Sequence, residues 1–190
     1  IPNLITLGRL VLAAVFFVLL GLFDPTAGPA LLDAALGVFL VALFSDFLDG
    51  YLARRWNVVS AFGRIVDPLV DKIIVLGGFI YLCAQPLAGP SGVSPWMVAV
   101  MLTRELLVTS LRAQQEAGGQ DFGAAFSGKL KMVLQSAAVA WCVFHVNRGE
   151  ALGEYAAAIR DGLLWTAVAV TVLSGLLYLR RAFSPAAGGR

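Results

Sequence analysis

The sequence predicts an all-α integral membrane protein with six transmembrane helices and both termini in the cytoplasm. Hydrophobic residues make up 59% of the 190 residues, charged residues only 14%, and the mean hydropathy is +0.83. An ordinary soluble domain has roughly 45–50% apolar and about 25% charged residues. This composition excludes a soluble enzyme, a disordered chain and a disulfide-rich secreted domain. The spacing of the apolar runs and the positions of the charges give the number of helices and their orientation.

Six apolar segments are long enough to cross a bilayer, for which a helix needs about 20 mostly apolar residues. Proline, glycine and asparagine separate them, as between Pro86 and Pro95. The first segment is interpreted as a spanning helix, because it is too long for a signal peptide and lacks a small-residue cleavage site. We expect a single membrane domain over residues 1–190. The predicted spans are 4–23, 30–53, 62–84, 94–115, 125–146 and 158–179.

The Lys and Arg residues gather at one set of predicted helix ends. Of the 14 cations, only Arg148 and Arg160 lie on the other side. Cytoplasmic loops carry an excess of Lys and Arg, so this asymmetry places both termini in the cytoplasm. The net charge of +2 is too small to indicate a nucleic-acid-binding protein. The cations on the predicted cytoplasmic side are Arg9, Arg54, Arg55, Arg64, Lys72, Arg104, Arg112, Lys129, Lys131, Arg180, Arg181 and Arg190.

Four aspartates lie in the second and third predicted spans, where a lipid-facing helix would not tolerate them. Asp46 and Asp49 share one helical stripe because they are three residues apart, and Asp67 and Asp71 share another at a spacing of four. Two antiparallel helices joined by a short turn would bring these carboxylates together. Aspartates at helix ends often act only as caps or as solvated groups, but four on matching stripes favour a ligand site.

A divalent cation would relieve the repulsion between these carboxylates. Hard oxygen ligands with no His or Cys nearby suit Mg²⁺ or Mn²⁺. Gly50 and Gly63 lie on the same two stripes, and the absence of a side chain there leaves room for a ligand to approach the backbone. The sequence therefore predicts a metal site on these two helices.

Residues 46–71 resemble the signature of the CDP-alcohol phosphatidyltransferase family, D-x-x-D-G-x-x-A-R, eight residues, then G-x-x-x-D-x-x-x-D. All of its fixed positions match. Further segments are similar to bacterial members: residues 2–6 with Arg9, residues 103–105 with 110–112, and residues 128–131. The matching signature residues are Asp46, Asp49, Gly50, Ala53, Arg54, Gly63, Asp67 and Asp71.

The resemblance implies a homodimer in the inner membrane, with a polar cavity that faces the cytoplasm. It implies transfer of the phosphatidyl group from CDP-diacylglycerol to glycerol-3-phosphate, giving phosphatidylglycerophosphate and CMP. Asp46, Asp49, Asp67 and Asp71 would bind one or two divalent ions, and Asp71 would act as general base or as a metal ligand alone. The residues implied around CDP-diacylglycerol are Asn3, Thr6, Asp49, Gly50, Ala53, Arg54, Ser60 and Gly63.

Recognition of a phosphorylated acceptor requires cations in the cavity. Arg104 and Arg112 are eight residues apart and share a helix face, and Lys129 opens the next span. We predict that these three residues bind the acceptor phosphate and that Glu105 pairs with one of the cations. Arg112, Lys129 and Lys131 have an alternative role as residues that extend to the interface or contact anionic lipid.

The signature alone does not distinguish glycerol-3-phosphate from another acceptor alcohol such as inositol phosphate or serine. A divalent-cation transporter could also contain intramembrane aspartates, but no polar path continues to the other side. Other residues are interpreted as having no role in the reaction. Cys83 and Cys142 are interpreted as buried apolar groups, and His145 lies at the outer end of the fifth span. The interface or packing aromatics are Trp96, Trp141, Trp165 and Tyr178.

Overall fold

The computed structural model describes residues 2–26, 28–56, 61–117 and 126–183 of the chain, and side chains for 7–26, 28–45, 69–115, 128–149 and 151–182. Within this part every regular element is a helix. The helices are α1 (Pro2–Gly21), α2 (Ala30–Trp56), α3 (Ala61–Leu82), α4 (Ala88–Ser91), α5 (Pro95–Ala117), α6 (Phe126–Leu152) and α7 (Glu154–Phe183).

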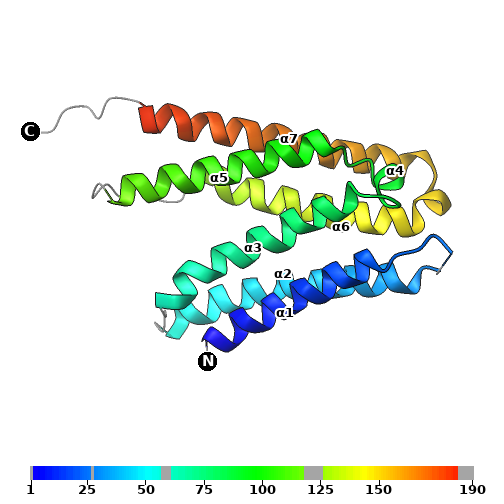
Figure 1. The fold of residues 1–190 in the computed structure, drawn as a ribbon, viewed down its shortest axis with the longest axis horizontal. Helices are drawn as coiled ribbons and strands as arrows, with labels where there is room; N and C mark the ends of the chain where they lie inside the picture. Colours follow the sequence, from blue (N-terminus) through cyan, green and yellow to red (C-terminus); the bar gives the residue numbers. More distant parts are fainter. Residues whose placement is uncertain (1, 27, 57–60, 118–125, 184–190) are drawn as a thin grey trace, which may run out of the picture.

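The six long helices form a bundle in which successive long helices run in opposite directions (Figure 1). The start of α1, the end of α2, the start of α3, the end of α5, the start of α6 and the end of α7 lie at one end, here called the N-terminal end (Figure 1). The α1–α2 connection, the segment that contains α4, and the α6–α7 turn lie at the other, here called the α4 end (Figure 1). This alternation is expected for apolar helices joined by short connections.

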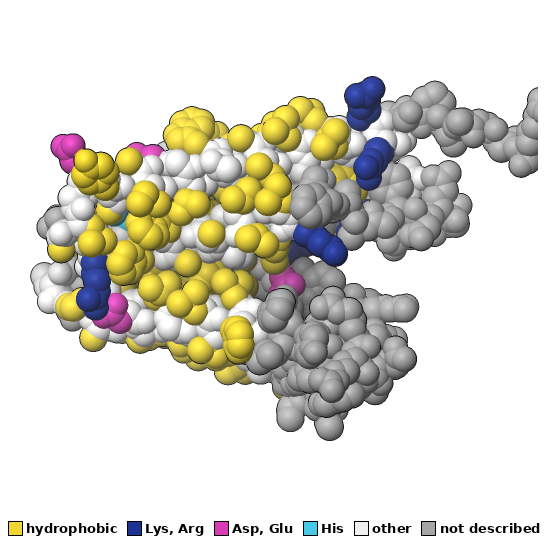
Figure 2. All heavy atoms as spheres, turned by 180° about the vertical axis from the view of Figure 1, so that it is seen from behind, with side chains coloured by type: hydrophobic (Ala, Val, Ile, Leu, Met, Phe, Trp, Pro, Cys, Tyr) yellow, Lys and Arg dark blue, Asp and Glu magenta, His cyan; other side chains and the backbone are white. Residues whose placement is uncertain are grey.

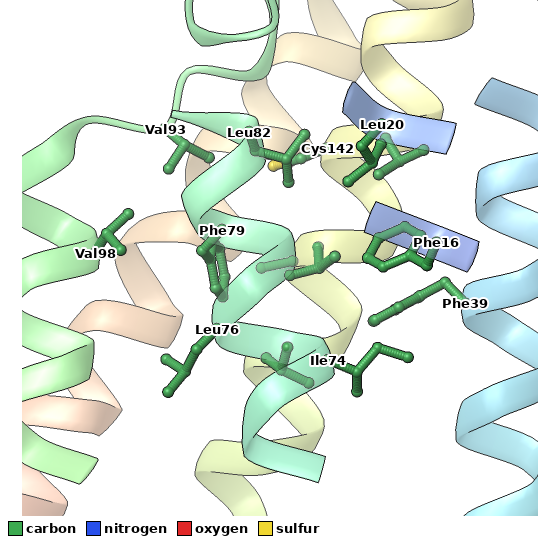
Figure 3. Packing of buried hydrophobic residues seen from close by; sticks show 14 of the residues in the cluster. Phe16, Leu20, Phe39, Ile74, Leu76, Phe79, Leu82, Val93, Val98 and Cys142 are labelled. Carbon is green, nitrogen blue, oxygen red and sulfur yellow. The ribbon is translucent and has the colours of Figure 1, made fainter. Parts of the chain in front are cut away.

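Helices α3 and α6 connect the parts of the bundle, because α3 contacts α1, α5 and α6, and α6 contacts α2, α3, α4 and α7. Phe79 of α3 is fully buried, as are Phe16 of α1 and Phe39 of α2. Figure 3 shows Phe16 and Phe39 facing each other between α1 and α2, with ring centroids 5.0 Å apart. These side chains belong to one continuous apolar core that also includes Leu20 and Cys142. The core fixes the position of α3 relative to the helices on both sides.

The outside of the bundle is apolar along most of its length. Large hydrophobic side chains such as Val11, Phe44, Leu106 and Leu173 are exposed. Figure 2 shows such side chains over the middle of one face, and Lys, Arg, Asp and Glu toward its two ends. A soluble protein would bury these groups, whereas lipid solvates them.

Among the described residues, Glu154–Ala182 in α7 is long and apolar enough to cross a membrane, and Leu7–Gly21 and Ala30–Ser45 are shorter apolar stretches. The long helices occupy the six segments that the sequence predicts as spans. Charged residues in the middle of α3 and α5 lower the apolar character of those helices without ending them. Helix α4, which lies in the segment between Pro86 and Pro95, was not predicted.

The two cysteines differ in burial. Cys142 is fully buried in the apolar core, which confirms the interpretation made from the sequence. Cys83 is only half-buried, and its Sγ donates a hydrogen bond to the carbonyl oxygen of Ile80 at 3.2 Å. The prediction that both thiols are buried is therefore wrong for Cys83, which lies where α3 ends and packing is less complete.

Candidate active site

Asp71 lies halfway along α3, on the side that contacts α1. Arg9 of α1 donates a hydrogen bond from Nη2 to Oδ1 of this carboxylate and forms an ion pair with it. Arg9 is buried, whereas 20% of the Asp71 side chain is exposed. A carboxylate at this depth needs a compensating cation, and α1 supplies it. The carboxylate is thus held by a neighbouring helix and is still accessible from one side.

Arg9 is not among the residues that the sequence predicts for the site. The signal that could have revealed it is a cation in the middle of an otherwise apolar helix, since such a residue normally faces the interior of a bundle. Its partner could not be read from the sequence, because Arg9 and Asp71 are 62 residues apart and meet only when α1 packs on α3.

The remaining predicted metal ligands are placed only at the level of the backbone. Asp46 and Asp49 lie in the second half of α2, and Asp67 lies in α3 one turn before Asp71. Their side chains are outside the described residues. The same holds for the predicted nucleotide-binding residues: Asn3 and Thr6 in α1, Gly50, Ala53 and Arg54 in α2, and Gly63 in α3, while Ser60 lies entirely outside the described part.

The backbone placement is consistent with a cluster of hard oxygen donors. Helix α2 ends at Trp56 and α3 begins at Ala61, so the two helices meet at the N-terminal end (Figure 1). Among the side chains that the structure describes, no group of three His, Cys, Asp or Glu residues could hold a metal ion, but that set contains only Asp71 of the four aspartates. A set of carboxylates without nitrogen or sulfur donors suits Mg²⁺ or Mn²⁺.

A second polar cluster lies on another side of α3, against α5 and α6. Glu105 of α5 is buried at its centre. Its Oε1 accepts a hydrogen bond from Arg104 Nη1 at 2.8 Å and another from Nζ of Lys131 in α6. Lys72 of α3 places its Nζ 3.9 Å from Glu105 Oε2 and donates to Thr109 Oγ1 at 2.7 Å. The prediction that Glu105 pairs with one of these cations is confirmed.

Helix α7 completes this cluster with Tyr178 and Ser174, both buried. The Tyr178 hydroxyl accepts a hydrogen bond from Arg112 Nη2 at 3.0 Å, and Arg104 Nε donates to Ser174 Oγ at 3.1 Å. The guanidinium carbons of Arg104 and Arg112 lie 5.5 and 5.4 Å from the centre of the Tyr178 ring. These are distances at which a cation interacts favourably with an aromatic face. Tyr178 therefore joins the cluster, a role that its interpretation as a packing aromatic missed.

We call this group the cationic cluster; its members are Lys72, Arg104, Glu105, Arg112, Lys131 and Tyr178. It holds four cations and one carboxylate. Arg104 Nη2 is buried and has no hydrogen-bond partner in the described part of the chain. Buried guanidinium groups are normally fully hydrogen-bonded, so this N–H group is available to donate to a further acceptor.

The structure brings together only part of the predicted phosphate site. Arg104 and Arg112 both contact the Tyr178 ring. Lys129 is exposed, and within the described residues no hydrogen bond or ion pair joins it to the two arginines. Lys131, only 4% exposed, is the lysine of α6 that enters the cluster. The two lysines are two residues apart on a helix and so face different directions. The sequence alone did not show which of them faces α5.

Comparisons with known proteins agree with these features. A family model described as CDP-alcohol phosphatidyltransferase matches residues 1–173. The CDP-diacylglycerol–glycerol-3-phosphate 3-phosphatidyltransferase of Bacillus subtilis (strain 168) is 35% identical over 190 residues, which cover 95% of this chain and 94% of the relative. The protein of the same description from Escherichia coli (strain K12) is 35% identical over 187 residues, which cover 96% of this chain and 94% of the relative.

Proposed function

Because the chain belongs to the CDP-alcohol phosphatidyltransferase family, we propose that it transfers the phosphatidyl group of CDP-diacylglycerol to glycerol-3-phosphate. The products are phosphatidylglycerophosphate and CMP. The observation that supports this acceptor is the buried cationic cluster on the α5 side of α3. Asp71 and Lys72 are consecutive residues of α3, and they face α1 and α5, respectively. One turn of α3 therefore carries both the proposed catalytic carboxylate, Asp71, and one lysine of the cationic cluster, Lys72.

The charge of the cluster matches a phosphorylated acceptor better than serine. Three cations, Lys72, Arg104 and Lys131, lie around the single carboxylate of Glu105, and Arg112 lies nearby on the Tyr178 ring. This excess of positive charge in a largely buried region is costly unless an anion is bound. Glycerol-3-phosphate carries a dianionic phosphate group, and arginine fits phosphate oxygens with paired N–H groups. Arg104, Arg112 and Lys129 remain our proposed phosphate-binding residues, and the packing adds Lys131 as a fourth.

Asp46, Asp49, Asp67 and Asp71 are the proposed ligands of one or two Mg²⁺ or Mn²⁺ ions. When bound, such an ion would neutralise the charge of the pyrophosphate and make CMP a better leaving group. The side chains proposed to surround CDP-diacylglycerol are those of Asn3, Thr6, Asp49, Ala53, Arg54 and Ser60, with the backbone at Gly50 and Gly63.

In the proposed reaction Asp71 accepts the proton of the acceptor hydroxyl. The hydroxyl oxygen attacks the phosphorus that carries the diacylglycerol, and the bond from that phosphorus to the bridging oxygen breaks. CMP leaves with the electron pair of the broken bond. Arg9 acts as a positioning residue, because its hydrogen bond to Oδ1 fixes the carboxylate.

We further propose six membrane crossings in the cytoplasmic (inner) membrane, with both termini and the active site on the cytoplasmic side. The alternating directions of the long helices and the concentration of Lys and Arg at the N-terminal end support this orientation. We also propose that the protein is a homodimer, because the resemblance to the family implies one.

The test is CMP release from CDP-diacylglycerol by the purified full chain in detergent. Glycerol-3-phosphate, inositol phosphate, serine and water are compared as acceptors, each with EDTA, Mg²⁺ or Mn²⁺. We expect release only with a divalent ion and fastest release with glycerol-3-phosphate. Faster release with serine would contradict the proposed acceptor. Equal release in EDTA would contradict the metal site.

Matched lysine variants test the acceptor site itself. We expect Lys131→Gln to raise the KM for glycerol-3-phosphate by roughly tenfold or more, because a buried charge-assisted hydrogen bond is lost. The KM for CDP-diacylglycerol should change little. Lys129→Gln is the comparison: if it raises the acceptor KM and Lys131→Gln does not, the phosphate lies outside the buried cluster. Thermal unfolding of each variant separates these effects from loss of the fold.

A further inference from the structure

A pocket of about 630 Å³ opens at the α4 end of the bundle, away from Asp71. It lies where the α1–α2 connection, the segment around α4 and the end of α6 meet α7 (Figure 1). From Asp71 to the end of α3 at Leu82 the helix rises about 16 Å toward this end, at ~1.5 Å per residue. The pocket is therefore separate from the active site and from the cationic cluster.

The polar part of the pocket wall is cationic. Arg148 and Arg160 line it together with His145 and Asn147, and none of the Asp and Glu side chains that the structure describes lines it. These arginines are the only two of the 14 cations that the sequence places on the non-cytoplasmic side. Positive charge is usually depleted on that side of a membrane protein, so two arginines around one pocket call for a specific explanation.

The carboxylates that pair with these arginines lie outside the wall of the pocket. Arg160 Nε donates to Asp161 Oδ1 at 2.8 Å, but the arginine side chain is only 16% exposed whereas the aspartate is 52% exposed. Arg148 Nη2 donates to Asp33 Oδ2 at 2.7 Å across a largely exposed ion pair. Water screens Asp161 more strongly than it screens the less exposed Arg160, so Asp161 only partly offsets the positive charge that Arg160 brings to the pocket wall.

Two glycines make room for the side chains that define the pocket. A Cβ at Gly149 would lie 2.4 Å from His145 Nδ1, and a Cβ at Gly92 would lie 2.9 Å from Arg160 Nε. Gly92 also has a φ of +70°, which favours glycine. Arg160 is further fixed by a hydrogen bond from Nη1 to the carbonyl oxygen of Pro90 at 2.9 Å. The arginine and the histidine are thus held in place by the backbone around them.

His145 Nδ1 is buried and has no hydrogen-bond partner among the described residues. This atom faces the backbone of its own helix at Gly149. The His145 residue lines the pocket together with Arg148 and Arg160, and such a set of nitrogen-bearing side chains suits an oxygen-rich anion. Apolar residues such as Phe23 and Pro25 line the remaining wall, and they suit the carbon atoms next to a phosphate ester.

We propose that this pocket binds a phosphate group, supplied either by a phospholipid head group or by free inorganic phosphate. Arginine is the side chain that recognises phosphate oxygens with paired N–H groups. The pocket lies at the end of an apolar bundle, at the level where head groups meet the ends of membrane helices. This binding site is independent of the proposed transfer reaction.

His145 is the only histidine of the chain, so its imidazole reports on this pocket alone. The full chain is labelled with ¹⁵N-histidine, purified in a phosphate-free detergent, and titrated separately with dihexanoyl-phosphatidylglycerol, inorganic phosphate and dihexanoylglycerol. We expect a saturable shift of the ring ¹⁵N signals with a phosphate-bearing probe and none with dihexanoylglycerol. A shift with the lipid alone identifies a head-group site, and a shift with inorganic phosphate alone identifies a free-anion site. Each of these two results supports the proposal.

Variants show whether the shift comes from the pocket. Arg160→Gln and Arg148→Gln should each weaken binding by about tenfold or more, because each removes a charge-assisted hydrogen bond. Arg180→Gln, which changes an exposed arginine at the N-terminal end of the bundle, is the matched control. CMP release should be unchanged in all three variants, which verifies their fold. No saturable shift with either phosphate-bearing probe, or an equal shift with dihexanoylglycerol, would overturn the proposal. So would unchanged binding in Arg148→Gln.

Discussion

Asp71 combines partial exposure with a fixed hydrogen bond, which are the two properties that a general base in a lipid-facing enzyme requires. Asp71→Asn keeps the shape of the side chain and removes its ability to accept a proton. We expect CMP release with glycerol-3-phosphate to fall by roughly 10²–10⁴-fold, the usual contribution of general acid–base catalysis. Asp24→Asn is the control, because Asp24 is an exposed aspartate in the α1–α2 connection. A rate within a few-fold of the unchanged protein would remove Asp71 from the reaction.

A second prediction concerns the contribution of the ion pair between Arg9 and Asp71 to the free energy of unfolding. Removing one partner of a buried pair leaves an uncompensated charge and costs about 3–5 kcal/mol. Arg9→Gln should therefore lower the free energy of unfolding by about this amount. The double variant Arg9→Gln/Asp71→Asn should lose less than the sum of the two single variants, because it contains neither charge. Reversible unfolding in detergent measures all three, and strict additivity would show that the two residues do not interact.

For individual residues, the sequence predicted the chemical role of a side chain more readily than the side chain that it contacts. The spacing of Asp67 and Asp71, and that of Arg104 and Arg112, follows the period of a single helix and can be read without a structure. The pairing of Arg9 with Asp71 and the choice of Lys131 over Lys129 depend on how helices far apart in the chain rotate against one another. The spacing of residues within one helix does not show how that helix is rotated against its neighbours.

Helices α1 and α3 pack closely where Gly77 of α3 meets Phe17 of α1. A Cβ at Gly77 would lie 2.2 Å from the Phe17 ring, and that ring stacks on Tyr81 with centroids 5.6 Å apart. The ring cannot move without disturbing Tyr81, so Gly77→Ala should destabilise the protein by about 1–3 kcal/mol. The same shift would alter the contact that positions Arg9 against Asp71.

Gly37→Ala in α2 is the matched control for this prediction. Gly37 is exposed in the interior of a helix, and a Cβ there would meet no atom within 4 Å. Alanine is favoured over glycine in such a position by roughly 0.5–1 kcal/mol, so this variant should be neutral or slightly more stable. Thermal unfolding of the two variants in one detergent makes the comparison. Equal stability of both would show that α1 and α3 do not pack closely at Gly77.

The positions of the long helices were predictable because each is marked by an apolar run, whereas their ends were predicted less well. Helix α6 extends to Leu152 and α7 begins at Glu154, although the apolar runs suggested an end at 146 and a start at 158. The length of an apolar run reflects the thickness of the hydrocarbon core of the bilayer. The backbone hydrogen bonds of the helix continue beyond it into the polar layer at the membrane surface. The extension of α6 supplies part of the pocket at the α4 end, and segments far apart in the chain supply the rest, so the pocket could not be predicted from the sequence.

On the scale of the whole molecule, charge and apolar surface are arranged along one axis. Exposed hydrophobic side chains surround the bundle, the predicted aspartate site and most cations lie toward the N-terminal end, and the phosphate pocket lies at the α4 end. This polarity suits an enzyme that takes a nucleotide-activated lipid and a soluble phosphate ester from one compartment. It also requires the two ends of the bundle to be on opposite sides of the membrane.

Cysteine labelling in intact bacterial cells tests that requirement. In a Cys83→Ala/Cys142→Ala background, Thr26→Cys places a single thiol in the exposed α1–α2 connection, and Gln114→Cys places one on the exposed surface of α5 near the N-terminal end. We expect a membrane-impermeant maleimide to modify the first in intact cells and the second only after permeabilisation, because the positive charge is retained in the cytoplasm. The reverse pattern would place the aspartates outside the cell, away from the cytoplasmic supply of the acceptor. Modification of both thiols in intact cells would mean that the bundle does not cross the membrane as proposed.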